Sequence, residues 1–175
     1  MFMHSQMSGG YFADPRFRMV RIPYLGGGVS MYVVLPAPGR PTLTTERPSG
    51  VWLATAIARV EKARVMLIMP RFRIEARSEL RVSLEAMGVG RAFAADADFS
   101  RARSGTEGPV RIGRVLHQVF VEVDEHGTEA AAATGVYLSV QVRASASFVV
   151  DQPFLFAIRD DVAREVLFLG HVAEL

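Results

Sequence analysis

Few side chains in this sequence have the type and spacing that an active site needs. The chain has no cysteine, which excludes disulfides, thiolate metal sites and a cysteine nucleophile. No two histidines have the HxH or HxxxH spacing that can place two ligands on one metal ion. The four histidines are His4, His117, His126 and His171. We therefore expect no metal site and no cofactor.

Motifs of other catalytic and nucleotide-binding classes are also absent from the sequence. It contains no GxSxG elbow, no P-loop and no dinucleotide fingerprint, and the glycine run 26–28 has no helix after it. Two acidic pairs fall in expected turns, where aspartate is common. These pairs are Asp96 with Asp98 and Asp160 with Asp161. We expect no catalytic residues and a protein that is not an enzyme.

Composition places the chain among globular proteins. Its 175 residues are 50% hydrophobic and 22% charged, enough to bury the core of one domain. The formal charge is only +2, and apart from Lys62 the cations are scattered arginines, a bias typical of a G+C-rich genome. These arginines are expected to be solvated. No apolar stretch approaches the roughly 20 residues of a transmembrane helix, and the first ten residues do not form a signal peptide. Neither nucleic acid nor a membrane is an expected partner.

Most of the chain has the patterns of β-strands. Residues 17–22 and 29–35 flank the glycine run, which predicts a hairpin. Other alternating or continuously apolar stretches predict further strands. They are residues 65–70, 71–77, 115–123, 147–150, 153–158 and 165–172.

Helical patterns are short. Residues 51–59 form an amphipathic piece in which Trp52 is expected to anchor a core or an interface. A helix is predicted from Ser78, its N-cap, to Met87, with Gly88 closing it, because Leu80, Leu84 and Met87 share one face. The expected fold class is α+β, with mainly antiparallel sheets and one or two short helices.

Residues 121–135, VEVDEHGTEAAAATG, combine a strand pattern with an alanine run that favours a helix. If the residues after Gly127 entered a sheet as a strand, alternate side chains would face inward. One alternate row is uncharged: Thr128, Ala130, Ala132, Thr134, Val136, Leu138 and Val140. The other row carries Glu129, Tyr137 and Gln141, as a solvent-facing row would. Composition alone would favour an ordinary exposed loop or short helix.

This segment resembles the proximal hinge of the reactive-centre loop in serpins, a family of serine protease inhibitors. The hinge positions are Glu125, Gly127, Thr128, Glu129, Ala130, Ala131, Ala132 and Ala133. Three other stretches resemble serpin segments in the family's order: MPRFRIEARSEL, AFAADADFS, and DQPFLFAIRD with EVLFLGHV. The resemblance covers nearly all 175 residues, and it is to the C-terminal half of a family whose members are roughly twice this length.

The resemblance implies a single serpin-like domain over 1–175, with the hinge and an exposed reactive-centre loop at 124–147. It implies a suicide substrate: a serine protease forms a covalent acyl-enzyme with the loop, which then inserts into a β-sheet. In many serpins the cleaved bond follows the residue fourteen positions after the hinge glycine, which gives Gln141–Val142 here. A longer loop would give Arg143–Ala144, the bond that a trypsin-like protease prefers. The family is usually extracellular.

Two alternatives stay open. His117 matches a histidine that serpins hold under the strand beside the insertion gap, where it helps to control sheet opening; it could equally be an ordinary buried core histidine. The chain could also be a non-inhibitory serpin fragment or a binding or structural module, because the N-terminal half that would form the other side of the gap has no counterpart in it. Open strand edges would then favour self-association.

Overall fold

The computed structural model describes residues 2–40, 49–102, 110–124 and 145–175. The chain divides into two compact units. Unit 1 comprises Met1–Phe72 with Val123–Leu175, and unit 2 comprises Arg73–Glu122. The prediction of a single domain over 1–175 stays a prediction. None of the helices among these residues is long and apolar enough to cross a membrane.

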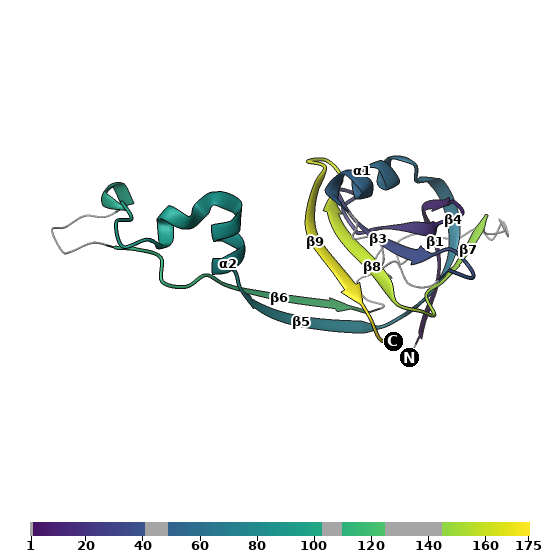
Figure 1. Cartoon of the computed structure of the whole chain (residues 1–175). Helices are drawn as coiled ribbons and strands as arrows, with labels where there is room; N and C mark the ends of the chain where they lie inside the picture. Colours follow the sequence, from purple (N-terminus) through teal and green to yellow (C-terminus); the bar gives the residue numbers. More distant parts are fainter. Residues whose placement is uncertain (1, 41–48, 103–109, 125–144) are drawn as a thin grey trace. The chain divides into compact units, whose positions relative to one another are not determined.

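Unit 1 is built on a seven-stranded sheet with the strand order β7-β4-β1-β2-β3-β8-β9 (Figure 1). Neighbouring strands are antiparallel except β4 and β7, which are parallel. The strands are β1 (Phe2–Ala13), β2 (Phe17–Pro23), β3 (Val29–Pro36), β4 (Glu61–Pro70), β7 (Ala146–Val149), β8 (Phe154–Asp160) and β9 (Glu165–Val172).

The predicted hairpin of β2 and β3 is confirmed, with Phe17 opposite Pro36 and Pro23 opposite Ser30. Gly26 and Gly27 have φ values of 89° and 75° in the connecting turn, a conformation that glycine adopts without steric strain. The strands predicted near the C-terminus are confirmed as β7, β8 and β9. Local patterns in the sequence therefore predicted most strands of this sheet.

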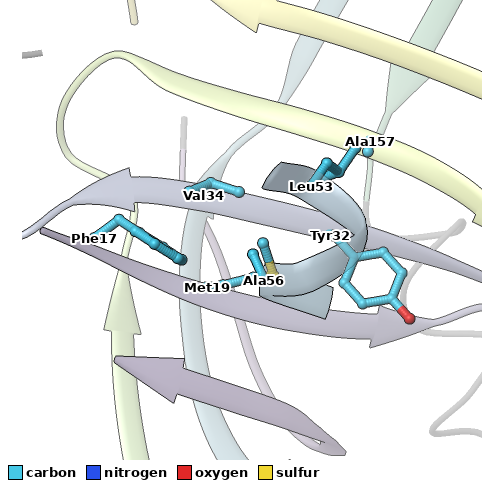
Figure 2. Close-up of a cluster of buried hydrophobic side chains, with 7 residues drawn as sticks. All are labelled: Phe17, Met19, Tyr32, Val34, Leu53, Ala56 and Ala157. Atoms are coloured by element: carbon cyan, nitrogen blue, oxygen red, sulfur yellow. The ribbon is translucent and has the colours of Figure 1, made fainter. Parts of the chain in front are cut away.

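Helix α1 (Gly50–Ala58) begins at Ser49, whose Oγ accepts a hydrogen bond from the Trp52 backbone N–H at 3.2 Å. Its buried residues Leu53 and Ala56 pack against the sheet (Figure 2). Trp52 packs against this cluster with its ring centroid 4.9 Å from that of Phe17, as expected of a core anchor. The buried members of the cluster are Phe17, Met19, Tyr32, Val34, Leu53, Ala56 and Ala157.

The opposite face of the sheet is also buried. Leu35 follows Val34 in β3 and is completely buried on the other face. Phe148 of β7 and Phe154 of β8 are likewise inaccessible to solvent, and the Phe72 ring lies 5.4 Å from that of Phe154. Burial on both faces explains why β3 is mostly apolar in sequence, with Ser30 as its buried polar residue.

Strand β1 was not predicted, because residues 2–13 contain serines, a glutamine and two glycines. It pairs with β4 on one side and with β2 on the other. A Cβ atom at Gly9 would overlap the Arg21 carbonyl oxygen, so the glycine permits a close approach of two backbones. Long-range pairing therefore overrides the weak local preference of this strand.

Unit 2 contains β6 (Leu116–Val123) paired with β5 (Phe72–Glu79), followed along the chain from β5 by a series of short helices. Phe72, the first residue of β5, and Val123, the last residue of β6, belong to unit 1. The helices are α2 (Arg81–Leu84), the π-helical turn η2 (Glu85–Val89) and the 3-10 helices η3 (Gly90–Phe93) and η4 (Ser100–Ala102).

The predicted helix start at Ser78 is wrong. Ser78 lies inside β5, and the first helical turn begins at Leu80 without a side-chain cap. The Leu80 N–H donates to the Val115 carbonyl oxygen at 2.8 Å, so pairing across the strands carries β5 through the expected cap. Met87 is 78% exposed and does not share a buried stripe with Leu80 and Leu84. The chain does turn at Gly88, where φ is 93°.

Candidate functional site

The predicted hinge and both candidate reactive bonds lie outside the described residues. They fall between Asp124 and Ser145, and this includes Gln141–Val142 and Arg143–Ala144. The site can be described only from the two ends that hold this segment. Those ends are the last residues of β6 and the first residues of β7.

The N-terminal end of the segment is β6. Val121 and Val123 are each 7% exposed, whereas Glu122 between them is exposed. This confirms the predicted alternation where the strand ends, with valines on one face and polar residues on the other. Strand β6 therefore ends on a buried side chain, Val123, and Asp124 is the last described residue before the segment.

Strand β6 is paired with β5 along one edge (Figure 1). The Gln118 amide nitrogen donates to a Glu75 carboxylate oxygen at 3.2 Å, and the Arg73 guanidinium lies 4.9 Å from the centroid of the Phe120 ring. Partner numbers rise along β5 as they fall along β6, so the two strands are antiparallel. Within the described ranges, no strand pairs with the other edge of β6.

Ser145, the first described residue after the segment, is hydrogen-bonded to β4. The Ser145 backbone N–H donates to the Arg64 carbonyl oxygen at 2.8 Å. The Ser145 hydroxyl oxygen also accepts from the Arg64 N–H and donates to the Arg64 carbonyl oxygen, both at 3.2 Å. Strand β7 then runs parallel to β4, and its Phe148 side chain is completely buried. The described chain resumes at Ser145, which these hydrogen bonds hold against β4.

His117 is exposed on β6. Neither reading of His117, as an ordinary core histidine or as a residue that helps to control sheet opening, is tested by this exposure. The valine face of β6 becomes buried only toward its C-terminal end, at Val121 and Val123, and His117 lies nearer the other end. A role for His117 in sheet opening stays a prediction.

A polar cluster that the sequence did not predict lies at the β8–β9 turn. The Asp161 carboxylate accepts hydrogen bonds from the Arg21 Nε and Nη2 at 3.2 and 2.7 Å, from the Ser30 hydroxyl at 2.7 Å, from the Tyr32 hydroxyl at 2.8 Å and from the Arg159 Nη1 at 3.0 Å. Ser30 is completely buried. We call these five residues the Asp161 cluster. It joins β2 and β3 to the end of β8 through one carboxylate.

Ionisation of Asp161 is favoured by this cluster. Burial alone would raise the pKa of Asp161, but the hydrogen bonds from Ser30, Tyr32 and Arg21 and the positive charge of Arg21 outweigh it, so that pKa is below its usual value. Burial, together with the hydrogen bond to Asp161, raises the pKa of the Tyr32 hydroxyl. The carboxylate is therefore charged and the phenol neutral at neutral pH.

The two adjacent aspartates have different roles. Asp160 Oδ1 accepts from the backbone N–H groups of Val162 and Ala163, both at 2.9 Å, which confirms the expected turn former. Asp161 is the centre of a partly buried ion-pair cluster instead. The expectation of solvated arginines is also wrong for Arg21 and Arg159, whose side chains are 30% and 15% exposed.

Comparison with known proteins identifies the class to which this fold belongs. The family model described as "Serpin (serine protease inhibitor)" matches residues 1–175, and the chain belongs to this family. The family that the sequence indicated is thereby confirmed. The fold class is confirmed as well, since the described residues form mostly strands in a mixed sheet with few helices.

Similar proteins come from distant organisms. Serpin-Z1C of Triticum aestivum is 36% identical over 98% of this chain and 46% of its own length. Leukocyte elastase inhibitor of Sus scrofa is 32% identical over 99% of this chain and 47% of its own length. The crystal structure of the thermophilic serpin tengpin in its native state has a TM-score of 0.77 and 28% identity, and the match covers 99% of this chain and 46% of tengpin.

The chain thus spans about half the length of the relatives it matches. Members of the family are protease inhibitors and in general are not enzymes. In the described part of the chain, no group of three or more histidines, aspartates or glutamates is placed to hold a metal ion.

Proposed function

We propose that this chain carries the bait and the hinge of a serine protease inhibitor that acts as a suicide substrate. The observation that carries the proposal is the position of the alanine-rich segment, which directly follows the buried end of β6 in a chain of the serpin family. Residues 124–147 act as hinge and reactive-centre loop within one serpin-like domain over 1–175. The partner is a serine protease, and neither nucleic acid nor a membrane takes part.

Trapping proceeds by acyl transfer and strand insertion. The hydroxyl oxygen of the protease's serine attacks the carbonyl carbon of the bait residue, and the peptide bond to the next residue breaks. The freed amine takes a proton, while the bait residue stays bound to the protease as an ester. The hinge then enters a β-sheet as a new strand before water hydrolyses that ester, as serpin loops do.

The open edge of β6 supports insertion beside that strand. Its outer edge is unpaired among the residues that the structure describes, and unpaired N–H and C=O groups on an edge are a template for another strand. The uncharged row from Thr128 to Val140 suits the face that becomes buried. Gly127 supplies the backbone freedom for the bend between β6 and the inserted strand.

Gln141–Val142 is the proposed reactive bond. A protease holds residues on both sides of the bond that it cuts, so those residues must be free to enter its cleft. Three residues separate Gln141 from Ser145, which is held by hydrogen bonds to Arg64. The alternative bond, Arg143–Ala144, leaves only Ala144 before that anchor. The anchor therefore favours Gln141 over Arg143 as the bait residue.

Two further assignments follow from the family. We place His117 beside the path of insertion, where its imidazole acts in sheet opening from an exposed position on β6. We also propose an extracellular location, where a protease inhibitor of this class would meet its target.

A second candidate function is a non-inhibitory serpin fragment that acts as a binding or structural module. It is favoured because the chain spans only part of its relatives' length, 46% in the case of Serpin-Z1C. It is also favoured by the sheet that contains β6, which has only two strands in the described part. Insertion requires a strand on each side of the gap, and the described residues supply one side.

A denaturing gel distinguishes the two functions. The chain is mixed with trypsin-like, chymotrypsin-like and elastase-like proteases, and the expected result with one of them is a complex that survives boiling. In the variant Thr128→Arg a charged side chain must enter the sheet, so we expect cleavage without a stable complex. Glu129→Arg introduces the same side chain into the solvent-facing row and should keep the complex. Cleavage without any complex in the unmodified chain would favour the non-inhibitory module.

A further inference from the structure

Ser145 is joined to a single residue of the neighbouring strand by three hydrogen bonds. Its backbone N–H donates to the Arg64 carbonyl oxygen at 2.8 Å. Its hydroxyl accepts from the Arg64 N–H and donates to the Arg64 carbonyl oxygen, both at 3.2 Å. A carbonyl oxygen has two lone pairs and can accept both donors. We call these three hydrogen bonds the Ser145 anchor.

The Ser145 hydroxyl acts at a point where a strand would use only its backbone. Strand β7 pairs with β4 in parallel from Ala146 to Val149, and such a ladder is built from backbone N–H and C=O groups. Both backbone polar groups of Arg64 are directed toward Ser145 instead. Two of the three bonds of the anchor depend on the hydroxyl, and among the described residues this hydroxyl is the acceptor for the Arg64 N–H.

The anchor engages a backbone group that a protease would need. A peptide that is bound as an extended strand uses its own backbone N–H and C=O groups for binding, and serine proteases hold substrates in this way on both sides of the bond that they cut. For the Arg143–Ala144 bond, Ser145 is the second residue after the bond, and its N–H is already bonded to Arg64. For the Gln141–Val142 bond, the second residue after the bond is Arg143, which is not part of the anchor.

The residue types at Arg143–Ala144 suit a trypsin-like protease. Such a protease binds an arginine through an aspartate in its specificity pocket, and the residue after Arg143 is a small alanine and not a proline. Residue types alone would therefore favour this bond over Gln141–Val142. The Ser145 anchor is the described feature that distinguishes the two bonds.

We propose that the Ser145 hydroxyl is a specificity determinant of the inhibitor, because it holds Ser145 on Arg64 and so excludes trypsin-like proteases from the Arg143–Ala144 bond. Ser145 is a positioning residue, since it touches neither the attacking serine of the protease nor the bait carbonyl group. The consequence for the choice of target protease rests on the proposed function, in which the bait residue selects the protease that is trapped. The anchor itself does not rest on that function.

Cleavage by trypsin tests the role of the hydroxyl. The rate of cleavage at Arg143–Ala144 is measured by mass spectrometry after denaturation, from the appearance of the peptide 144–175. This peptide is released at every cut, whether or not the other product stays bound to the protease. Ser145→Ala removes two of the three bonds of the anchor. We expect it to raise the rate by about fivefold to tenfold, given the usual net strength of such hydrogen bonds.

Three controls separate the anchor from a general loss of structure. Ser145→Thr retains a hydroxyl and should keep the rate of the unmodified chain. Ser147→Ala is the same substitution in the same strand, at a residue that pairs with Met66 and not with Arg64, and it should also leave the rate unchanged. A cut after Arg21, which lies in β2 between two paired strands, reports opening of the whole sheet. Its rate should be the same in all variants.

Hydrogen exchange of the Arg64 backbone amide tests the anchor without any protease. We expect this amide to exchange faster in Ser145→Ala than in the unmodified chain or in Ser145→Thr, because its acceptor is lost. Equal exchange in all three chains would overturn the inference.

The cleavage rates can also contradict the inference. An unchanged rate at Arg143–Ala144 in Ser145→Ala would overturn it, as would an equal rise in Ser145→Thr or a rise accompanied by faster cleavage after Arg21. Faster cleavage at Arg143–Ala144 in Ser145→Ala, with no covalent complex for any serine protease, would support the anchor and refute the proposed function. The two claims therefore fail by different results.

Discussion

Replacing Asp161 with asparagine should destabilise unit 1 although the side chain keeps its size. Oδ2 accepts three of the hydrogen bonds in the Asp161 cluster, two from Arg21 and one from Ser30, and Oδ1 accepts the other two, from Tyr32 and Arg159. Asparagine replaces one oxygen with an NH2 group that faces donors. At least two of the five bonds are lost, and two arginines lose their counter-charge.

The size of this effect follows from burial. Removing one partner of a fully buried ion pair costs about 3–5 kcal/mol, because an uncompensated charge is left behind. The Asp161 and Arg21 side chains are 14% and 30% exposed, so water relieves part of this penalty. We expect Asp161→Asn to lower the free energy of unfolding by about 2–3 kcal/mol at pH 7.

Urea unfolding followed by Trp52 fluorescence is the assay. Trp52 packs on the core cluster of unit 1, so its emission reports on the unit that contains Asp161. Asp160→Asn is the matched control, because Asp160 accepts only two backbone N–H bonds in the turn and asparagine is also favoured in turns. Its expected effect is within about 0.5 kcal/mol.

The destabilisation caused by Asp161→Asn should depend on pH. The pKa of Asp161 is lowered in the folded protein. The stability that its charge contributes is therefore fully present above its pKa in the unfolded chain, about 3.9, and is lost as the pH falls through its pKa in the folded chain. The difference between the unmodified chain and Asp161→Asn should therefore shrink below about pH 4. Equal destabilisation by both substitutions, or a difference that does not change in acid, would refute the assigned role of the cluster.

Two other substitutions test the local structure of unit 1 by the same unfolding assay. Ser49→Ala removes the side-chain acceptor for the Trp52 N–H and should lower the free energy of unfolding by about 1 kcal/mol, whereas Ser49→Asp should retain the cap. Gly9→Ala places a Cβ against the Arg21 carbonyl oxygen and should cost about 1–3 kcal/mol by separating β1 from β2. Gly50→Ala, where a Cβ would meet no atom within 4 Å, should be neutral or slightly stabilising, and a loss similar to that of Gly9→Ala would contradict the close-approach explanation.

The fold was predictable where its signals are local. The β2–β3 hairpin has two apolar stretches around glycines that the turn requires, and β8 and β9 flank a turn that Asp160 stabilises. Strand β1 was not predictable in this way. Its Gly9 is unfavourable for a strand by local preference, and only the close approach of the Arg21 carbonyl oxygen in the folded chain explains the glycine. Its strand conformation depends on partners on both sides.

The site was predictable only in part, for related reasons. The alanine-rich hinge has a specific order of residue types, and the family match confirms the family that this order indicates. The Asp161 cluster joins residues as far apart as Arg21 and Asp161, which are separated by 140 positions. A serine and an arginine within apolar strands were the only local signs of it. Likewise, the exposure of His117 could not be derived from an alternating pattern, which assigns a residue to a face but does not say how far that face is covered.

Intact mass spectrometry of the chain after reaction with its target protease tests the central claim most directly. We predict a covalent adduct with the mass of the protease plus residues 1–141, less one water, together with a released peptide that begins at Val142. A peptide that begins at Ala144 would move the bait residue to Arg143. Complete cleavage with no adduct for any serine protease would contradict the claim that this chain carries the bait of a suicide inhibitor.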